Sequence, residues 1–239
     1  MTATHPTSQD RDNSPDPATD PAHSGASGTP VSTTRPVRSP RNRRRRRVLM
    51  AAVVAVLCTV GGYLWLNAPA TLALTGETDC ADVPVHSTIR AAESEQVHAG
   101  VCTAMAAISK AWADHDADAY GQAFTANATY TTFAGTHYQG RTDIVDSHDA
   151  LFDGVLEGTE LADAFLALDI LTEEVAVLTT RGDTYEGSVP DRLTKVQTYT
   201  SVRVDDQWLV ASFHNTQRQE AMERIQFLWM PGSAPAGER

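Results

Sequence analysis

The longest apolar segment of the chain is Val48–Leu66, which holds 19 residues without a charge and directly follows the five arginines Arg43–Arg47. A helix rises 1.5 Å per residue, so this run is about long enough to cross the roughly 30 Å hydrocarbon core of a bilayer. We therefore expect a transmembrane helix over residues 48–66. Because lysine and arginine stay on the cytoplasmic side, the N-terminus is expected inside and the residues after Leu66 outside.

A cleaved export signal is the alternative interpretation of the same segment. Ala68-Pro69-Ala70 matches a small-residue cleavage pattern, and Arg45-Arg46 before the apolar run resembles a twin-arginine signal. The protein would then be secreted after cleavage near Ala70. Both interpretations place the rest of the chain outside the cytoplasm.

Helical periodicity begins at about Ile89. Apolar residues recur there at spacings of three and four, which puts them on one helix face: Val97, Val101, Met105, Ile108 and Trp112. A short second helix is expected around Ala119–Phe124, with Asp116 or Asp118 at its N-terminus, where carboxylates meet unpaired N–H groups. A third helix is expected from about Thr142 to Leu156.

Strand patterns alternate with these helices and then close the chain. Thr129–Phe133 and Thr136–Gln139 flank a turn at Ala134-Gly135 and predict a hairpin. Four β-type segments follow the third helix: Leu161–Leu171, Val175–Tyr185, Leu193–Val204 and Gln207–Gln217. Asp205-Asp206 is expected to form the tight turn between the last two, and a short helix is expected beyond Glu220.

This order of elements predicts the α+β class, with a curved antiparallel sheet wrapped around helices as a cone-shaped barrel. The transmembrane helix and a disordered tail precede it. The expected parts of the chain are a basic cytoplasmic tail over 1–47, the membrane helix over 48–66, a linker over 67–88, the cone domain over 89–230 and a flexible tail over 231–239.

Charge separates the tail from the domain. Residues 1–47 carry nine arginines and four aspartates, a sum of +5, so the formal net charge of −11 leaves −16 for residues 48–239. An acidic folded part argues against nucleic-acid binding, which needs a basic surface. The arginine run instead suits anionic lipid next to the membrane, and the Ser-, Thr- and Pro-rich tail cannot bury enough apolar surface to fold.

Cys80 and Cys102 both lie in the exported part, where disulfides persist. A bridge between them would join the linker to the first helix of the domain, whereas two free thiols are the alternative. Cys58 lies within the apolar run. The cysteine spacing matches no metal-ligand pattern, so no metal site is expected.

With these elements the sequence resembles the nuclear-transport-factor-two-like (cone fold) superfamily, its SnoaL-like group and, most closely, the SgcJ/EcaC family. The resemblance covers about residues 95–218 and rests on these positions: Ala111-Trp112, Asp116, Asp118, Phe124, Ala128–Tyr130, Gly135–His137, Gly140-Arg141, His148, Phe152, Thr180–Gly182 and Trp208–Thr216. It implies a pocket at the mouth of the cone and a homodimer. The oxidoreductase label of that family finds no support in a nucleotide-binding motif, so no cofactor is expected.

Strand alternation suggests which side chains face the pocket. The last strand also resembles that of the calmodulin-kinase association domain, which favours Leu209, Ala211, Phe213 and Asn215 as the inward set. Trp208, Val210, Ser212, His214 and Thr216 would then point outward. The same alternation places Gln197 and Tyr199 inward on the preceding strand, and Arg181 with Thr179 on the strand before that.

These positions predict a polar group in which Arg181, Gln197, Tyr199 and Asn215 orient a carbonyl, enol or carboxylate. Tyr130 and Phe213 are further expected ligand contacts. A satisfied polar network that braces the sheet is the alternative for each polar residue. His148, on the apolar stripe of the third helix, is the candidate acid or base, while His137 and His214 are weaker candidates.

Three functions remain open from the sequence. The domain binds a small apolar, oxygenated ligand outside the cell. Alternatively, it is a cofactor-free isomerase or cyclase in which Arg181, Tyr199 and Asn215 stabilise an oxyanion while a histidine moves a proton. In the third case it is a dimerisation module whose pocket is plugged by Phe213 and Phe133.

Overall fold

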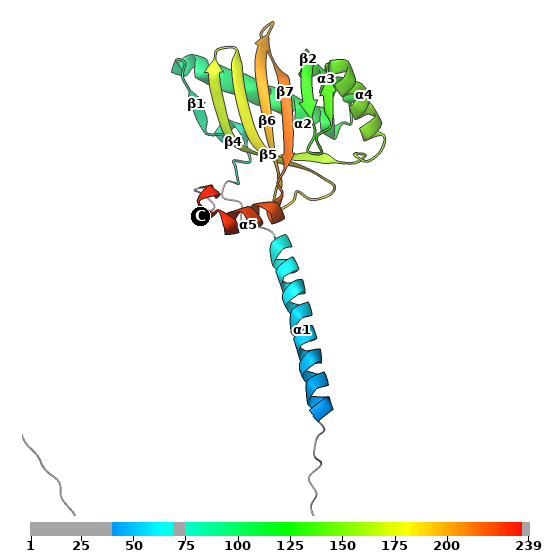
Figure 1. Ribbon diagram of the computed structural model, residues 1–239. Coiled ribbons are helices and arrows are strands. Elements are labelled where there is room, and N and C mark those ends of the chain that lie inside the picture. The colour runs from blue at the N-terminus through cyan, green and yellow to red at the C-terminus, as the bar shows by residue number, and fades with distance from the viewer. Residues whose placement is uncertain (1–39, 69–74, 236–239) are drawn as a thin grey trace, which may run out of the picture. The chain divides into compact units, whose positions relative to one another are not determined.

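The computed structural model describes residues 40–68 and 75–235 (Figure 1). The predicted disordered tail, apart from its last residues, and the cleavage position at Ala70 lie outside these ranges. The helices are α1 (Pro40–Asn67), α2 (Ala91–Ala113), α3 (Ala117–Gln122), α4 (Arg141–Phe152) and α5 (Glu220–Trp229), with short 3-10 helices η1 (Cys80–Asp82) and η2 (Pro231–Ser233). The strands are β1 (Val85–Ser87), β2 (Phe124–Thr131), β3 (His137–Gln139), β4 (Glu160–Thr172), β5 (Val175–Tyr185), β6 (Lys195–Val204) and β7 (Gln207–Gln217).

Helix α1 contains the apolar run. Its segment Asn42–Leu66 is long and apolar enough to cross a membrane, by length and composition. The helix begins before the predicted start at Val48 and includes Arg43–Arg47. Arginine is a good helix former, so nothing in the basic run ends the helix. A single-pass membrane anchor is compatible with this helix.

Helix α2 supplies one side of the domain core. The five residues of its predicted apolar stripe are all buried. Helix α3 begins as expected, because the carboxylate of Asp116 accepts a 2.8 Å hydrogen bond from the Ala119 backbone N–H. The chain leaves α3 two residues earlier than predicted, and Phe124 already begins β2.

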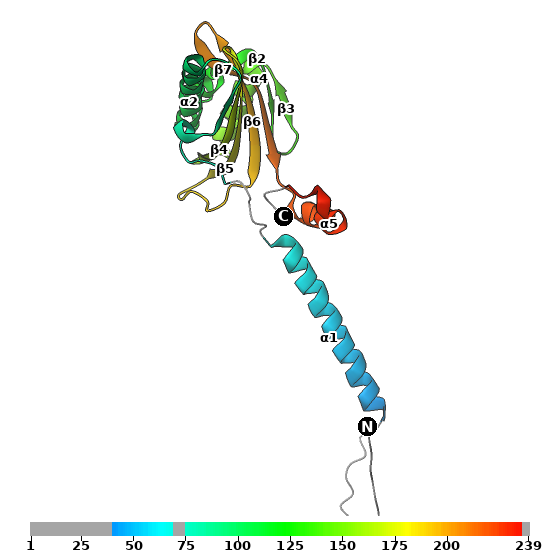
Figure 2. The same cartoon turned by 90° about the vertical axis from the view of Figure 1, so that its left-hand side faces the viewer.

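Seven strands form one sheet in the order β1-β4-β5-β6-β7-β2-β3. The predicted meander is confirmed as antiparallel β4–β7, and the predicted hairpin as β2–β3, while β2 runs parallel to β7. Asp205 and Asp206 both have positive φ, as a two-residue hairpin turn requires. The α+β class with a curved sheet is therefore observed, and α2 crosses one face of the sheet (Figures 1 and 2).

Two segments expected to be irregular join the domain. Strand β1 lies within the expected linker and pairs in parallel with β4, with Val85 opposite Leu168. All three β1 side chains are exposed, so the segment lacks the alternation by which a strand is recognised in a sequence. Near the other end, η2 forms within the expected flexible tail, and Ala234 after it is buried.

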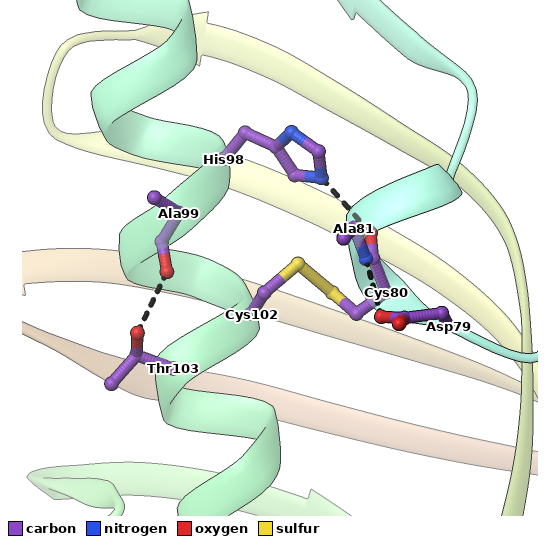
Figure 3. The surroundings of a disulfide bond; sticks show 7 residues. All are labelled: Asp79, Cys80, Ala81, His98, Ala99, Cys102 and Thr103. Carbon is purple, nitrogen blue, oxygen red and sulfur yellow. Dashed lines mark hydrogen bonds between the residues drawn. A yellow bond between two sulfur atoms is a disulfide. The ribbon is translucent and has the colours of Figure 1, made fainter.

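A disulfide between Cys80 and Cys102 joins η1 to α2, with the two Cα atoms 5.6 Å apart (Figure 3). A second link lies beside it, since the His98 ring Nε2 is 2.9 Å from the Cys80 carbonyl oxygen. That carbonyl can only accept, so Nε2 carries the proton. The segment before α2 is thus held to the helix by a covalent bond and a hydrogen bond.

A β-bulge in β7 changes which residues of that strand face α2. Thr200 pairs with Ser212, but the next residue, Ser201, pairs with Val210, so Ala211 is the extra residue. The predicted outward position of Val210 and Trp208 is therefore wrong: Val210 is fully buried in the core, and the Trp208 ring packs directly over Gly100 of α2. An alternating pattern cannot reveal one inserted residue.

Candidate functional site

A cavity of about 480 Å³ lies between the concave face of the sheet and helices α2, α3 and α4. This volume is in the range of small-molecule sites. Aromatic and aliphatic side chains form most of its wall, with a few polar groups among them. Its lining residues are Trp112, Tyr120, Tyr130, Thr132, Phe133, Thr136, Tyr138, His148, Leu151, Val155, Leu156, Leu161, Asp183, Thr184, Lys195, Gln197, Tyr199, Phe213 and Asn215.

Packed rings form one wall of the cavity. Tyr130 and Tyr199 flank Phe213, with ring centroids 4.5 and 4.7 Å from its own. The Tyr120 hydroxyl lies 3.5 Å from that of Tyr130. Burial raises the pKa of Tyr130 to about 12, so its hydroxyl stays protonated and can donate. Phe213 and Phe133 line this cavity rather than fill it, contrary to the plugged pocket that the sequence left open.

His148 reaches the cavity from α4 and is almost fully buried among rings. Its Nδ1 lies 2.8 Å from the Ile144 carbonyl oxygen, so Nδ1 carries the proton and Nε2 is the basic nitrogen. Burial lowers the pKa of the ring, which keeps it neutral at pH 7. The Tyr120 ring lies 4.5 Å away, centroid to centroid. This geometry suits a core histidine, and it leaves one nitrogen able to accept a proton.

Gln197 is held in place by two hydroxyls. Its Oε1 accepts hydrogen bonds from Thr180 Oγ1 at 3.0 Å and from Tyr199 Oη at 3.5 Å. The side chain lies directly over Gly182, where an added Cβ would collide with the amide. The glycine in the Thr180–Gly182 sequence is thus needed for this close approach.

Asn215 presents an unsatisfied polar atom to the same cavity. Its Oδ1 is buried and has no hydrogen-bond partner among the described residues. An unpaired buried acceptor is costly, and a ligand that donates a hydrogen bond would satisfy it. The predicted inward direction of Asn215 and Phe213 is confirmed, because they pair with Gln197 and Tyr199 across β6–β7.

Asp163 is the acidic group that the sequence reasoning missed. It lies on β4 opposite Gly182, two residues from the cavity-lining Leu161, and therefore on the concave face. Burial raises the pKa of its carboxyl to about 7. The pKa of Tyr199 is raised mainly by burial of its hydroxyl, and the charge of Asp163 is the second cause. The signal in the sequence is a lone carboxylate in an otherwise apolar strand segment, Leu161–Leu168.

The mouth of the cavity lies at one end of the sheet. Lys195 and Asp183 form an ion pair there, and the Lys195 ammonium lies 5.3 Å from the centre of the Phe133 ring. Val155, in the segment after α4, is 81% exposed, and Phe133 is 55% exposed. Both are apolar side chains turned to the outside beside the opening.

Arg181 does not join the polar group, contrary to the sequence prediction. Across β5–β6, Thr180 lies opposite Gln197 and Arg181 lies opposite Val196. Residues directly opposite in an antiparallel pair share a face. Since Gln197 lines the cavity, Arg181 leaves the sheet on the other face, where it is buried. The error arises because the register across the long β5–β6 connection cannot be read from alternation within one strand.

The two other histidines named as candidates from the sequence, His137 and His214, do not line the cavity. His137 is exposed on β3 and its Nδ1 lies 3.0 Å from Thr131 Oγ1, while His214 pairs with Thr198 on the outer face.

Within the described residues, one group of three side chains has the proximity of metal ligands: Cys80, His98 and Cys102. Its two sulfur atoms are bonded to each other, so the group offers only one free ligand atom.

No family model and no curated protein matches the chain. Among solved structures, it is similar to a domain of unknown function with a cystatin-like fold from Nostoc punctiforme, at 23% identity and a TM-score of 0.47 over 62% of this chain and 90% of that one. An NTF-2-like protein of unknown function from Shewanella oneidensis MR-1 matches at 20% identity and a TM-score of 0.44, over 50% and 98% of the two chains. A ketosteroid isomerase-like protein from Erwinia carotovora atroseptica matches at 12% identity and a TM-score of 0.41, over 50% and 94%. The cone architecture rests on the element order and sheet topology above rather than on these values, and the finer SgcJ/EcaC assignment remains a prediction.

Proposed function

We propose that the domain binds a small, largely apolar molecule that carries a hydrogen-bond donor such as a hydroxyl, outside the cytoplasm and beside the membrane that α1 spans. The buried Asn215 Oδ1, unpaired among the described residues, supports this proposal most directly. The aromatic wall supplies apolar contact, and Gln197 and Tyr199 stand beside Asn215 across the sheet. Burying an apolar ring contributes about 25 cal/mol per Å².

Binding is tested with 2-naphthol, a small aromatic alcohol, added to the full chain in lipid nanodiscs and followed by its fluorescence. Asn215→Leu removes the acceptor and keeps the branched shape and the number of heavy side-chain atoms, so we expect the affinity to fall about 5- to 30-fold, as for one lost buried hydrogen bond. Asn127→Leu makes the same change at an exposed position of β2 and should leave the affinity unchanged. Equal affinities for the two variants and the wild type would contradict the proposal.

Acid–base catalysis is a second candidate function, favoured by Asp163 on the concave face, whose charge acts on Tyr199. A carboxylate with a pKa of about 7 can accept a proton near neutral pH. It would take a proton from a carbon next to a carbonyl, while a protonated hydroxyl such as that of Tyr199 stabilises the enolate oxygen. The proton then returns from Asp163 to a different carbon or to the same one.

This candidate predicts hydrogen–deuterium exchange into 2-tetralone, a ketone with acidic α-hydrogens, followed by mass spectrometry in D2O. The unprotonated Asp163 is the active form, so the exchange rate should rise about tenfold per pH unit below about 7 and level off above it. Asp163→Asn should lower the rate about 10²- to 10⁴-fold. Exchange that persists in Asp163→Asn with the same pH profile would exclude Asp163 as the base.

Three further expectations stand as proposals. The basic residues before the membrane helix hold the N-terminus in the cytoplasm and contact anionic lipid. The domain pairs with a second copy through its sheet. No nucleic acid binds, because the folded part is acidic.

A further inference from the structure

Helix α5 exposes an apolar face. Met222, Ile225 and Trp229 are 66%, 43% and 84% exposed, and their spacing of three and four places them on one side of the helix. Leu228 and Met230 beside them are also exposed. A contiguous apolar surface of this kind marks an interaction site rather than ordinary surface.

The opposite side of α5 is tied to the domain by ion pairs. Glu220 pairs with Arg192 in the connection between β5 and β6, and Glu223 accepts a 2.5 Å hydrogen bond from Nε of Arg218. On a helical wheel, Glu220 lies about 160° to 180° from Met222 and Trp229, and Glu223 lies about 100° to 120° from them. The acidic side chains are therefore neutralised against the domain, while the apolar face points away from these ion pairs.

Helix α5 begins at the end of the sheet that carries the cavity mouth. Lys195, at the mouth, pairs with Gln217, the last residue of β7 and three residues before α5. Phe133 follows the end of β2, which runs parallel to β7. The exposed Val155 and Phe133 of the mouth thus belong to the same end of the domain as the apolar face of α5.

The chain itself indicates what covers this end. The apolar segment of α1 ends at Leu66 and the described domain begins at residue 75, so eight residues, or about 30 Å of extended chain, separate them. A domain on so short a tether stays at the bilayer surface. Amphipathic helices with an exposed tryptophan insert their apolar face into the boundary between headgroups and acyl chains.

We propose that α5 lies in the lipid interface, with Met222, Ile225 and Trp229 inserted, so that the cavity mouth opens toward the bilayer. The inference rests on the membrane anchor of the proposed function. It also specifies the source of the ligand: an apolar molecule with a hydroxyl group enters from the lipid phase. The bilayer then serves as the reservoir from which the cavity is loaded.

The experiment uses the full chain in phosphatidylcholine vesicles that contain a phosphatidylcholine with a photoactivatable diazirine at the headgroup boundary. After irradiation, trypsin yields the peptide of residues 225–239, which carries Ile225 and Trp229 of the apolar face, and the peptide of residues 204–218 from β7. We expect roughly fivefold or greater lipid labelling of 225–239 over 204–218, since only the former reaches the interface. Ile225→Glu with Trp229→Glu should abolish the difference. Leu171→Glu, a matched change at an exposed residue of β4 at the other end of the sheet, should preserve it.

The peptide of residues 48–90, which contains the apolar run, reports the anchor separately. Labelling of 48–90 without labelling of 225–239 would overturn the α5 proposal and leave the anchor in place. Labelling of neither peptide would overturn both. Protection of 225–239 by a cross-link to a second copy of the chain would show that α5 is a dimer contact and not a lipid contact.

Discussion

Replacing Asp163 by asparagine is expected to stabilise the protein at pH 8 by about 2–4 kcal/mol. In the folded chain burial raises the pKa of this carboxyl from 3.8 to about 7. Each pKa unit corresponds to about 1.4 kcal/mol between the two protonation states. The charged carboxylate is therefore unfavourable in the folded protein, and asparagine removes the charge at nearly the same volume.

The sign of the pH dependence follows from the same shift. Below pH 3.8 the carboxyl is protonated in both the folded and the unfolded chain, so it costs nothing. Between 3.8 and about 7 only the unfolded chain loses the proton, and the free energy of unfolding falls as the pH rises. Above about pH 7 the carboxyl is charged in both states, and the decrease in the free energy of unfolding stays constant.

Urea unfolding of the full chain in a nonionic detergent, followed by near-ultraviolet circular dichroism from pH 4 to 8, measures this effect. Wild type should lose stability across this range relative to Asp163→Asn. Glu157→Gln removes one exposed carboxylate in the loop after α4 and should follow the wild-type curve. If Asp163→Asn gave a curve parallel to wild type, the carboxyl would titrate at its ordinary pKa and the base assignment would fail with it.

Removing the disulfide is expected to cost about 3 kcal/mol of stability. Cys80 and Cys102 are 22 residues apart, and closing a loop of this size restricts the unfolded chain by about that amount. The double variant Cys80→Ser with Cys102→Ser should therefore unfold at lower urea concentration. The loss arises mainly in the unfolded state, so the cavity and its ligand affinity should change little.

Treating the wild-type protein with a reductant should lower its stability by the same amount as the double serine substitution. Cys58→Ser is the control, because Cys58 is a free cysteine within α1. The same urea midpoint for wild type and the double variant under oxidising conditions would show that the two thiols are not joined.

Local patterns were sufficient for most of the elements. The apolar run of α1, the stripe of α2 and the alternation of β4–β7 are set by neighbours three or four residues away on a helix and two residues away on a strand. These distances lie within a single stretch of sequence. The cap of α3 at Asp116 and the turn at Asp205-Asp206 likewise depend on residues within about three positions of one another. The α+β class could therefore be predicted from local patterns, whereas the inward direction of Asn215 also required the resemblance of the last strand to a known domain.

The site itself depended on long-range register, which one sequence does not contain. Pairing of Thr180 with Gln197 turns Arg181 to the outer face, and the extra residue Ala211 turns Trp208 and Val210 to the core. Asp163 becomes a titrating group near neutral pH only because the packed sheet and helices remove water from it.

The sequence alone determined a membrane-type helix, an acidic α+β domain and the order of its elements, because these follow from composition and local periodicity. Only the tertiary structure decided which polar groups meet in the cavity and that its mouth shares one end of the sheet with α5. Such meetings depend on pairing between strands that lie far apart in the chain, and a one-residue shift of register exchanges the two faces of a strand.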